Sequence, residues 1–191
     1  MKTDSKTTDN LAAEYTMGLG RVHLYILLMI IPVLLVYLGT YILIWDFQDL
    51  RSGLLTYKAN IVLVTLAGII VHELLHGISW SFFVPGGMKS IRFGINWKFI
   101  APYCHCKEPL KVRHYKIGIA MPLIILGVCP SLAGIVSGNG AFLFFGIIFT
   151  WVAGGDIISL FMLRKLNNDT YVSDHPEKMG FYLESKSDYR E

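Results

Sequence analysis

Three residues of the sequence have the types and the spacing of a zinc-dependent hydrolase: His72, Glu73 and His76 form the pattern H-E-x-x-H. Positions four apart on a helix lie on one face, so both imidazoles can bind the same ion. Glu73 would then lie beside the metal, where its carboxylate can take a proton from water. The pattern predicts a Zn²⁺ site with His72 and His76 as ligands and Glu73 as the catalytic base.

The residues around this motif are apolar over the thickness of a bilayer. Residues 61–70 precede it, and residues 78–84 follow it with Ser79 and Ser81 as polar interruptions. Ionisable side chains at bilayer depth are costly and usually mark a functional site. The alternative is a structural polar pair between two helices.

The composition is that of a membrane protein. The chain has 191 residues, of which 53% are hydrophobic and 16% charged, and its net charge is +3. No stripe of Lys and Arg interleaved with aromatic residues indicates a nucleic-acid partner. Three cysteines in no paired pattern do not predict a disulfide framework. One membrane domain in contact with the lipid bilayer is expected.

Four segments are long and apolar enough to cross a bilayer: residues 23–45, 60–84, 117–136 and 141–163. Residues 1–22 read as a polar cytoplasmic segment and residues 46–59 as a short polar connection, while Pro122 and Pro130 are expected to interrupt the third span. Residues 166–191 form a polar cytoplasmic tail in which residues 181–183 could dock on the domain. The membrane-embedded, metalloprotease-like domain would then comprise residues 23–165.

A β-hairpin is predicted between the second and third spans. Ile91, Phe93, Ile95 and Trp97 alternate with polar residues or glycine, which is the period of a strand, and residues 99–105 could pair with it. Such a hairpin could offer its edge to an extended substrate, or it could merely close the cytoplasmic face. The predicted fold is an α-helical integral membrane protein with about four transmembrane helices and this small cytoplasmic β-hairpin.

Charge predicts the orientation. With four spans, 15 of the 17 Lys and Arg residues fall on the side of the two termini, and Arg51 and Lys58 on the other. The positive-inside rule therefore places both termini in the cytoplasm.

A third metal ligand is expected at Asp156. The ionisable side chains inside the spans, apart from weakly acidic groups and the boundary residue His23, are His72, Glu73, His76 and Asp156. Counted from residue 60, His72 and His76 lie about 18 and 24 Å deep; counted from residue 141, Asp156 lies about 22 Å deep. A catalytic zinc site has three protein ligands, and His72, His76 and Asp156 are expected at a similar depth in the bilayer. The small residues 153–155 would let the two helices approach.

These features together resemble a known family. The H-E-L-L-H helix, the basic loop with residues 103–107, the Met121-Pro122 helix and the Gly154-Gly155-Asp156 helix resemble the integral-membrane zincin peptidases, formerly a domain of unknown function. The arrangement is also similar to the core of the site-2 protease superfamily. The resemblance implies a bacterial plasma-membrane enzyme that cleaves a membrane protein or peptide. It places His72, His76 and Asp156 as zinc ligands and Glu73 as general base. Site-2 proteases carry Asn-Pro before the aspartate, and this chain does not.

Other residues admit other roles. Cys104 and Cys106 could form a second metal or redox site, and His105 could stabilise an oxyanion or a leaving group. Asp174-His175-Pro176 reads as a turn, and Cys129 as a small core residue.

Two other classes of function stay open. A transporter or proton pathway also places His, Glu and Asp at mid-membrane, and an inactive scaffold could keep zinc for structure.

Overall fold

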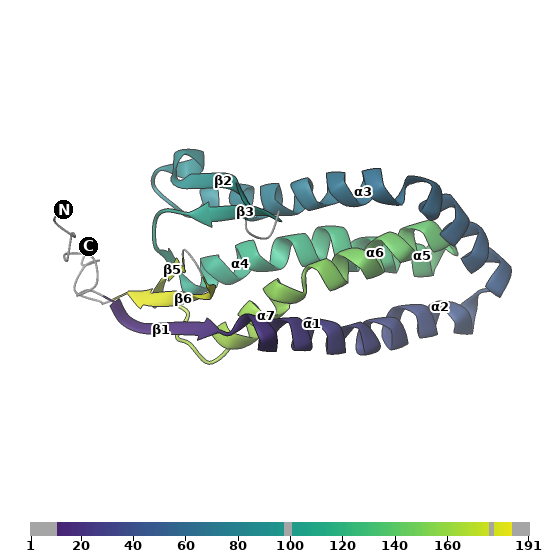
Figure 1. The fold of residues 1–191 in the computed structure, drawn as a ribbon, viewed down its shortest axis with the longest axis horizontal. Helices are drawn as coiled ribbons and strands as arrows, with labels where there is room; N and C mark the ends of the chain where they lie inside the picture. Colours follow the sequence, from purple (N-terminus) through teal and green to yellow (C-terminus); the bar gives the residue numbers. More distant parts are fainter. Residues whose placement is uncertain (1–10, 98–100, 176–177, 185–191) are drawn as a thin grey trace.

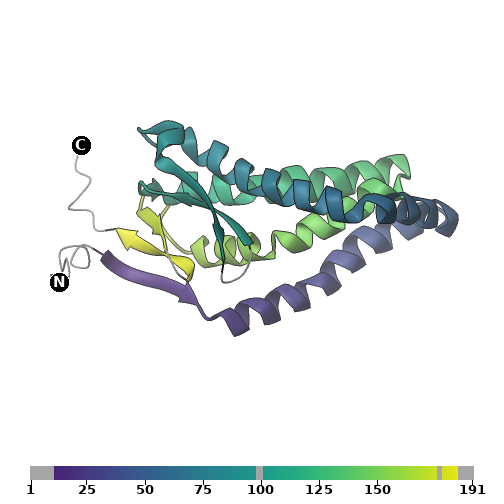
Figure 2. The ribbon, with the colours of Figure 1, turned by 45° about the horizontal axis from the view of Figure 1, so that its top comes forward.

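The computed structural model describes residues 11–97, 101–175 and 178–184, and most of them are helical (Figure 1). The helices lie lengthwise beside one another, with the strands gathered at one end (Figures 1 and 2). The helical elements are α1 (Leu19–Val33), η1 (Leu34–Leu38), α2 (Gly39–Ile44), α3 (Phe47–Ser81), η2 (Gly87–Ser90), α4 (Val112–Pro122), η3 (Leu123–Val128), α5 (Cys129–Ser137), α6 (Gly140–Val152) and α7 (Gly154–Leu163).

In the part of the chain that the structure describes, three helical runs are long and apolar enough to cross a membrane: Leu19–Ile44, Asn60–Ser81 and Val112–Ser137. The pair α6 and α7 makes a fourth candidate if it counts as one span, although the two helices meet at an angle of 51°. This result confirms the predicted helical fold at the coarse level of three to four candidate spans and a small hairpin.

The connection expected at residues 46–59 is instead part of α3 from Phe47 onward. Its residues Leu50, Gly53 and Tyr57 are buried at helical spacing, so this segment has an apolar face that packs on the other helices. A Cβ atom added at Gly53 would lie 2.4 Å from the backbone of Gly140, so α3 and α6 touch backbone to backbone here. The helix also ends at Ser81 rather than at residue 84, and α1 begins at Leu19 rather than at residue 23.

The two prolines of the third candidate span do not divide it. Pro122 ends α4, and η3, which is a turn of π-helix, leads directly into α5 with Pro130 in its first turn. Proline has no N–H to donate to the preceding turn, and a π-helical turn accommodates the missing bond without breaking the helix.

The fourth predicted span is bent where a straight helix was expected. Ala153 separates α6 from α7 with ψ of 12°, and two glycines follow it. Glycine pairs weaken a helix and are common sites of kinks. A Cβ atom at Gly154 would lie 3.0 Å from side-chain atoms of Ile26 and Met29, so the bend also seats α7 against α1. As a result Asp156 lies in the first turn of α7.

The strands of the described residues form two antiparallel sheets. The predicted hairpin is present as β2 (Ile91–Asn96) and β3 (Ala101–Cys106), with Phe93 opposite Cys104. A second sheet has the order β1-β6-β5-β4, formed by β1 (Leu11–Met17), β6 (Met179–Glu184), β5 (Tyr171–Asp174) and β4 (Leu110–Lys111). The interpretation of residues 1–22 and 166–191 as polar segments missed this sheet. Its inner face buries Leu110, Val172 and Phe181, each at most 1% exposed.

Two apolar clusters hold the fold together. At the far end of the helices, Tyr41, Leu50 and Leu143 are buried, and the Tyr41 hydroxyl donates to the carbonyl of Gly138. At the strand end, Trp80 and Tyr115 pack with residues of the second sheet, including Phe181. The functional site lies beside this second cluster.

Candidate metal centre

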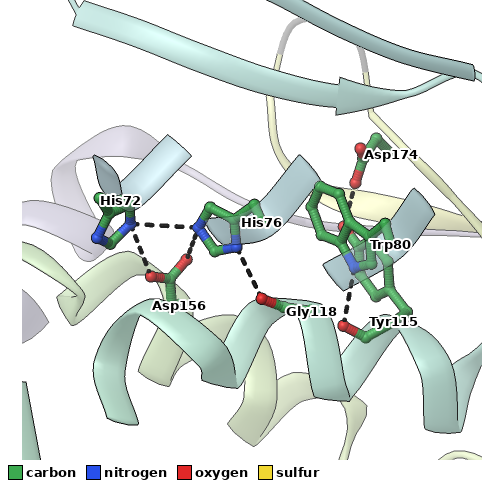
Figure 3. Close-up of polar contacts among 7 residues, drawn as sticks. All are labelled: His72, His76, Trp80, Tyr115, Gly118, Asp156 and Asp174. Atoms are coloured by element: carbon green, nitrogen blue, oxygen red, sulfur yellow. Dashed lines mark hydrogen bonds and ion pairs between the residues drawn. The ribbon is translucent and has the colours of Figure 1, made fainter. Parts of the chain in front are cut away.

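His72 and His76 lie one turn apart on α3, and both side chains are buried, with each residue 6% exposed. The α-helical repeat places them on one face, and that face meets Gly118 of α4 and Asp156 of α7 (Figure 3). Glu73 occupies the next position on the helix and is half-buried. The local geometry of the motif is therefore the one expected from its spacing.

Asp156 meets both histidines. Its Oδ2 atom lies 3.1 Å from Nε2 of His72, and its Oδ1 atom lies 3.3 Å from Nε2 of His76 (Figure 3). The two Nε2 atoms are 3.2 Å apart. The bend between α6 and α7 thus does not separate Asp156 from the histidines, because the carboxylate at the start of α7 still points at α3.

A backbone carbonyl orients one of the rings. Nδ1 of His76 lies 2.9 Å from the carbonyl oxygen of Gly118 in α4. A carbonyl can only accept, so this contact assigns the proton to Nδ1 and leaves the lone pair on Nε2. Histidines that bind metals commonly have their other nitrogen held in this way. Nδ1 of His72 is buried and has no hydrogen-bond partner.

The three converging groups fit a metal ion. Ligand atoms held about 2.0–2.1 Å from a tetrahedral zinc ion lie roughly 3.3 Å apart, close to the observed 3.1, 3.2 and 3.3 Å. Oδ2 of Asp156 is buried and makes no hydrogen bond. Lone pairs that face one another away from water are unfavourable unless a cation lies among them. In the described part of the chain, these three residues form the one group of three His, Cys, Asp or Glu side chains with this convergence.

Glu73 lies between this group and the hairpin. Its carboxylate interacts electrostatically with both histidines and Asp156, and it lies within hydrogen-bonding reach of the Cys104 backbone. The hairpin runs close to α3 here, since a Cβ atom at Gly77 would lie 2.4 Å from the Phe93 ring. The base position is thus flanked by the ligands on one side and by β3 on the other.

Other candidates from the sequence lie elsewhere. Burial raises the pKa of the Cys106 thiol to about 11 and also raises that of Cys104. Cys106 Sγ donates to the carbonyl of Glu108, and within the described residues neither thiol belongs to a convergent group of three metal-ligand side chains. His105 lies 3.5 Å from Oδ2 of Asp174 and takes no part in the convergent group. The interpretation of Cys129 as a core residue was wrong, because the residue is exposed.

Three residues behind His76 were missed by sequence reasoning. Trp80 stacks on His76 with ring centroids 5.3 Å apart, and Tyr115 stacks on Trp80 at the same spacing. Asp174 accepts a hydrogen bond from the Tyr115 hydroxyl (Figure 3). One signal was available, since positions 72, 76 and 80 repeat every four residues on α3. The contacts of Asp174 join segments far apart in the sequence and left no local signal.

Comparison with known families agrees with this geometry. The family described as "Putative zincin peptidase" matches residues 65–171, which include the H-E-x-x-H motif and Asp156. The chain belongs to this family. Membership in the zincin peptidase family indicates a metallopeptidase and implies zinc as the metal. No curated protein and no solved structure matches the chain.

Proposed function

We propose that the chain is a membrane-embedded zinc peptidase that hydrolyses peptide bonds in or near the bilayer. The observation that carries the proposal is the convergence of His72, His76 and Asp156 at spacings of 3.1 to 3.3 Å. These residues would hold the zinc ion, which supplies a Lewis acid that polarises the scissile carbonyl and acidifies water.

The proposed proton transfers belong to Glu73. Its carboxylate accepts a proton from the water that attacks the scissile carbonyl carbon, and it returns this proton to the amine nitrogen as the C–N bond breaks. Its position beside the two histidines, but on a different face of α3, supports this role. The carbonyl of Gly118 keeps His76 turned toward the site.

The outer edge of β3 is the proposed substrate-binding element. The N–H of Lys107, the residue after β3, donates to the carbonyl of Ser90 and so points toward the side of β2. The N–H of Cys106 points the opposite way, away from β2, and donates to Asp174. Backbone N–H and C=O groups alternate in direction along a strand, so those of Cys104 also point away from β2. An extended membrane protein or peptide that displaced the contact between Glu73 and the Cys104 backbone would lie against this carboxylate. We therefore favour substrate binding over mere closure of the cytoplasmic face.

The proposed zinc chemistry predicts a dependence on metal. Protein purified in detergent should contain about one zinc ion per chain and should cleave an extended peptide. A chelator should abolish cleavage, and added zinc should restore it, because the metal supplies the Lewis acid of the proposed reaction. Metal analysis and peptide cleavage on the same sample check this. A zinc-free protein, or cleavage insensitive to the chelator, would contradict the proposal.

The proposed location is the bacterial plasma membrane with both termini in the cytoplasm. β1 pairs with β6, and both lie at the same end of the helices as the hairpin, which supports an even number of crossings (Figure 1). Fifteen basic residues on that side support the orientation. We expect Ser185→Cys to resist a membrane-impermeant thiol reagent in intact cells and to react after lysis. Labelling of Ser185→Cys from outside would reverse the topology, and Lys58→Cys is the matched control for the opposite side.

A further inference from the structure

Asp174, the last residue of β5, is a partly buried carboxylate that joins three parts of the molecule. Its side chain is 13% exposed. Oδ2 accepts a hydrogen bond of 3.1 Å from the N–H of Cys106 in β3, and Oδ1 accepts one from the hydroxyl of Tyr115 in α4. Burying a carboxylate is costly, and these donors compensate for the lost water. Asp174 therefore links β3 and α4 to the sheet formed by the two terminal segments.

One path leads from Asp174 to the proposed catalytic base through β3. The bond to Cys106 anchors the end of β3, and the next outward-facing residue along this edge is Cys104. The backbone of Cys104 lies within hydrogen-bonding reach of Glu73. Asp174 thus holds the strand at a point two residues from the one that faces Glu73.

A second path leads to His76 through stacked rings. The Trp80 ring is inclined by 6° to Tyr115 and by 17° to His76, and Nε1 of Trp80 donates to the Tyr115 carbonyl (Figure 3). A Cβ atom at Gly118 would lie 2.0 Å from Nε1 of Trp80, so the indole fills the space above that glycine. The Tyr115 hydroxyl bonded to Asp174 ends this stack.

We propose that Asp174 is a positioning residue of the peptidase site, which holds the outer edge of β3 against Glu73. This inference rests on the proposed function. It assigns a role to a residue outside the segment that matches the family, residues 65–171. Because Asp174 touches neither the metal ligands nor Glu73, its loss should weaken binding of an extended substrate and leave the zinc content unchanged.

The first measurement is the reactivity of Cys106, which is 3% exposed. In a Cys104→Ser, Cys129→Ser background, Cys106 is the remaining thiol. Asp174→Ala should raise its rate of alkylation by N-ethylmaleimide about tenfold, as expected when a buried donor loses its charged acceptor. Asp174→Asn should raise the rate less than Asp174→Ala, because the amide oxygen can still accept from Cys106 and the amide nitrogen can donate to the oxygen of Tyr115. The part of the rise that remains comes from the lost negative charge, since its removal lowers the pKa of the Cys106 thiol.

The second measurement is cleavage of an extended peptide, with native cysteines in place. Asp174→Ala should raise KM about tenfold while kcat changes less than threefold and zinc stays at one per chain. Asp174→Asn should restore KM. Tyr115→Phe keeps the ring stack and removes the hydroxyl that donates to Asp174, so it should also raise KM. This variant tests the positioning role if Asp174→Ala does not fold. Asp169→Ala, which removes an exposed carboxylate paired with Arg113, is the matched control.

The outcomes separate the two proposals. Unchanged KM in both Asp174→Ala and Tyr115→Phe, with cleavage by the parent protein intact, would overturn the positioning role even if Cys106 became reactive. A rise in KM that Asp174→Asn does not correct would overturn it too. A parent protein without chelator-sensitive cleavage would overturn the proposed function, and with it the positioning role.

Discussion

Glu73→Gln is expected to keep its zinc and to lose cleavage by about 100-fold or more. Glutamine has nearly the volume of glutamate and can still accept from the backbone near Cys104, but it cannot take a proton from water. His72, His76 and Asp156 are unchanged in this variant, so the metal site should persist. The measurements are zinc content and the rate of peptide cleavage on the same preparations, with Glu14→Gln in the exposed part of β1 as the control.

Each deviation from this result has a distinct meaning. Cleavage by Glu73→Gln at the native rate would contradict general-base catalysis even with zinc in place, and would favour the transporter or scaffold interpretation. Loss of zinc together with cleavage would show instead that Glu73 helps to hold the metal. The variant that binds zinc and does not cleave can also trap substrates in native membranes, which would identify what the enzyme acts on.

The second large effect is expected at the three ligand positions. His72→Ala and His76→Ala should each lose most of the zinc, since removing one ligand leaves two and a catalytic zinc site uses three. Asp156→Ala should weaken zinc binding as well, and all three variants should lose cleavage for this reason. Metal analysis after dialysis against a weak chelator measures the loss. Loss of a group that only hydrogen-bonds to a metal ligand typically costs about 10–100-fold in metal affinity, so a loss of roughly 100-fold or more is expected for a ligand itself.

Matched controls are available for these variants. His114, in the first turn of α4, stacks on Phe83 and lies outside the convergent group, so His114→Ala should keep its zinc. Asp169→Ala is the matched control for Asp156→Ala, because it removes an exposed carboxylate outside the convergent group and should also keep its zinc. Full zinc in both histidine variants would contradict the assignment of the metal centre.

The helical spans, the hairpin and the motif were predictable because each is encoded locally. Runs of apolar residues predict helices of bilayer length, and the alternation from Ile91 to Trp97 predicts a strand. The i, i+4 spacing alone places His72 and His76 on one face. Asp156 was predictable for a different reason: an ionisable side chain is rare in an apolar span, so a small number of candidates existed.

The tertiary structure decided how these parts meet. Counting depth along a straight helix could not predict the 51° bend at Ala153, nor that Asp156 would still point at the histidines after it. The carbonyl of Gly118 that orients His76 comes from 42 residues away in the sequence. Such contacts have no local signature, because every residue has a carbonyl and only packing selects one.

The terminal sheet shows the same limit most clearly. Tyr15 pairs with Phe181 across nearly the whole chain, and the short strands around them mix polar and apolar residues, so neither segment predicts its partner by itself. Asp174 lies in an Asp-His-Pro sequence that is typical of a turn. Its burial between Cys106 and Tyr115 arises only when the tail folds back onto β3 and α4. The sequence by itself therefore predicted most of the helical spans and the positions of the motif residues on one helix face, whereas long-range pairing decided what surrounds and holds them.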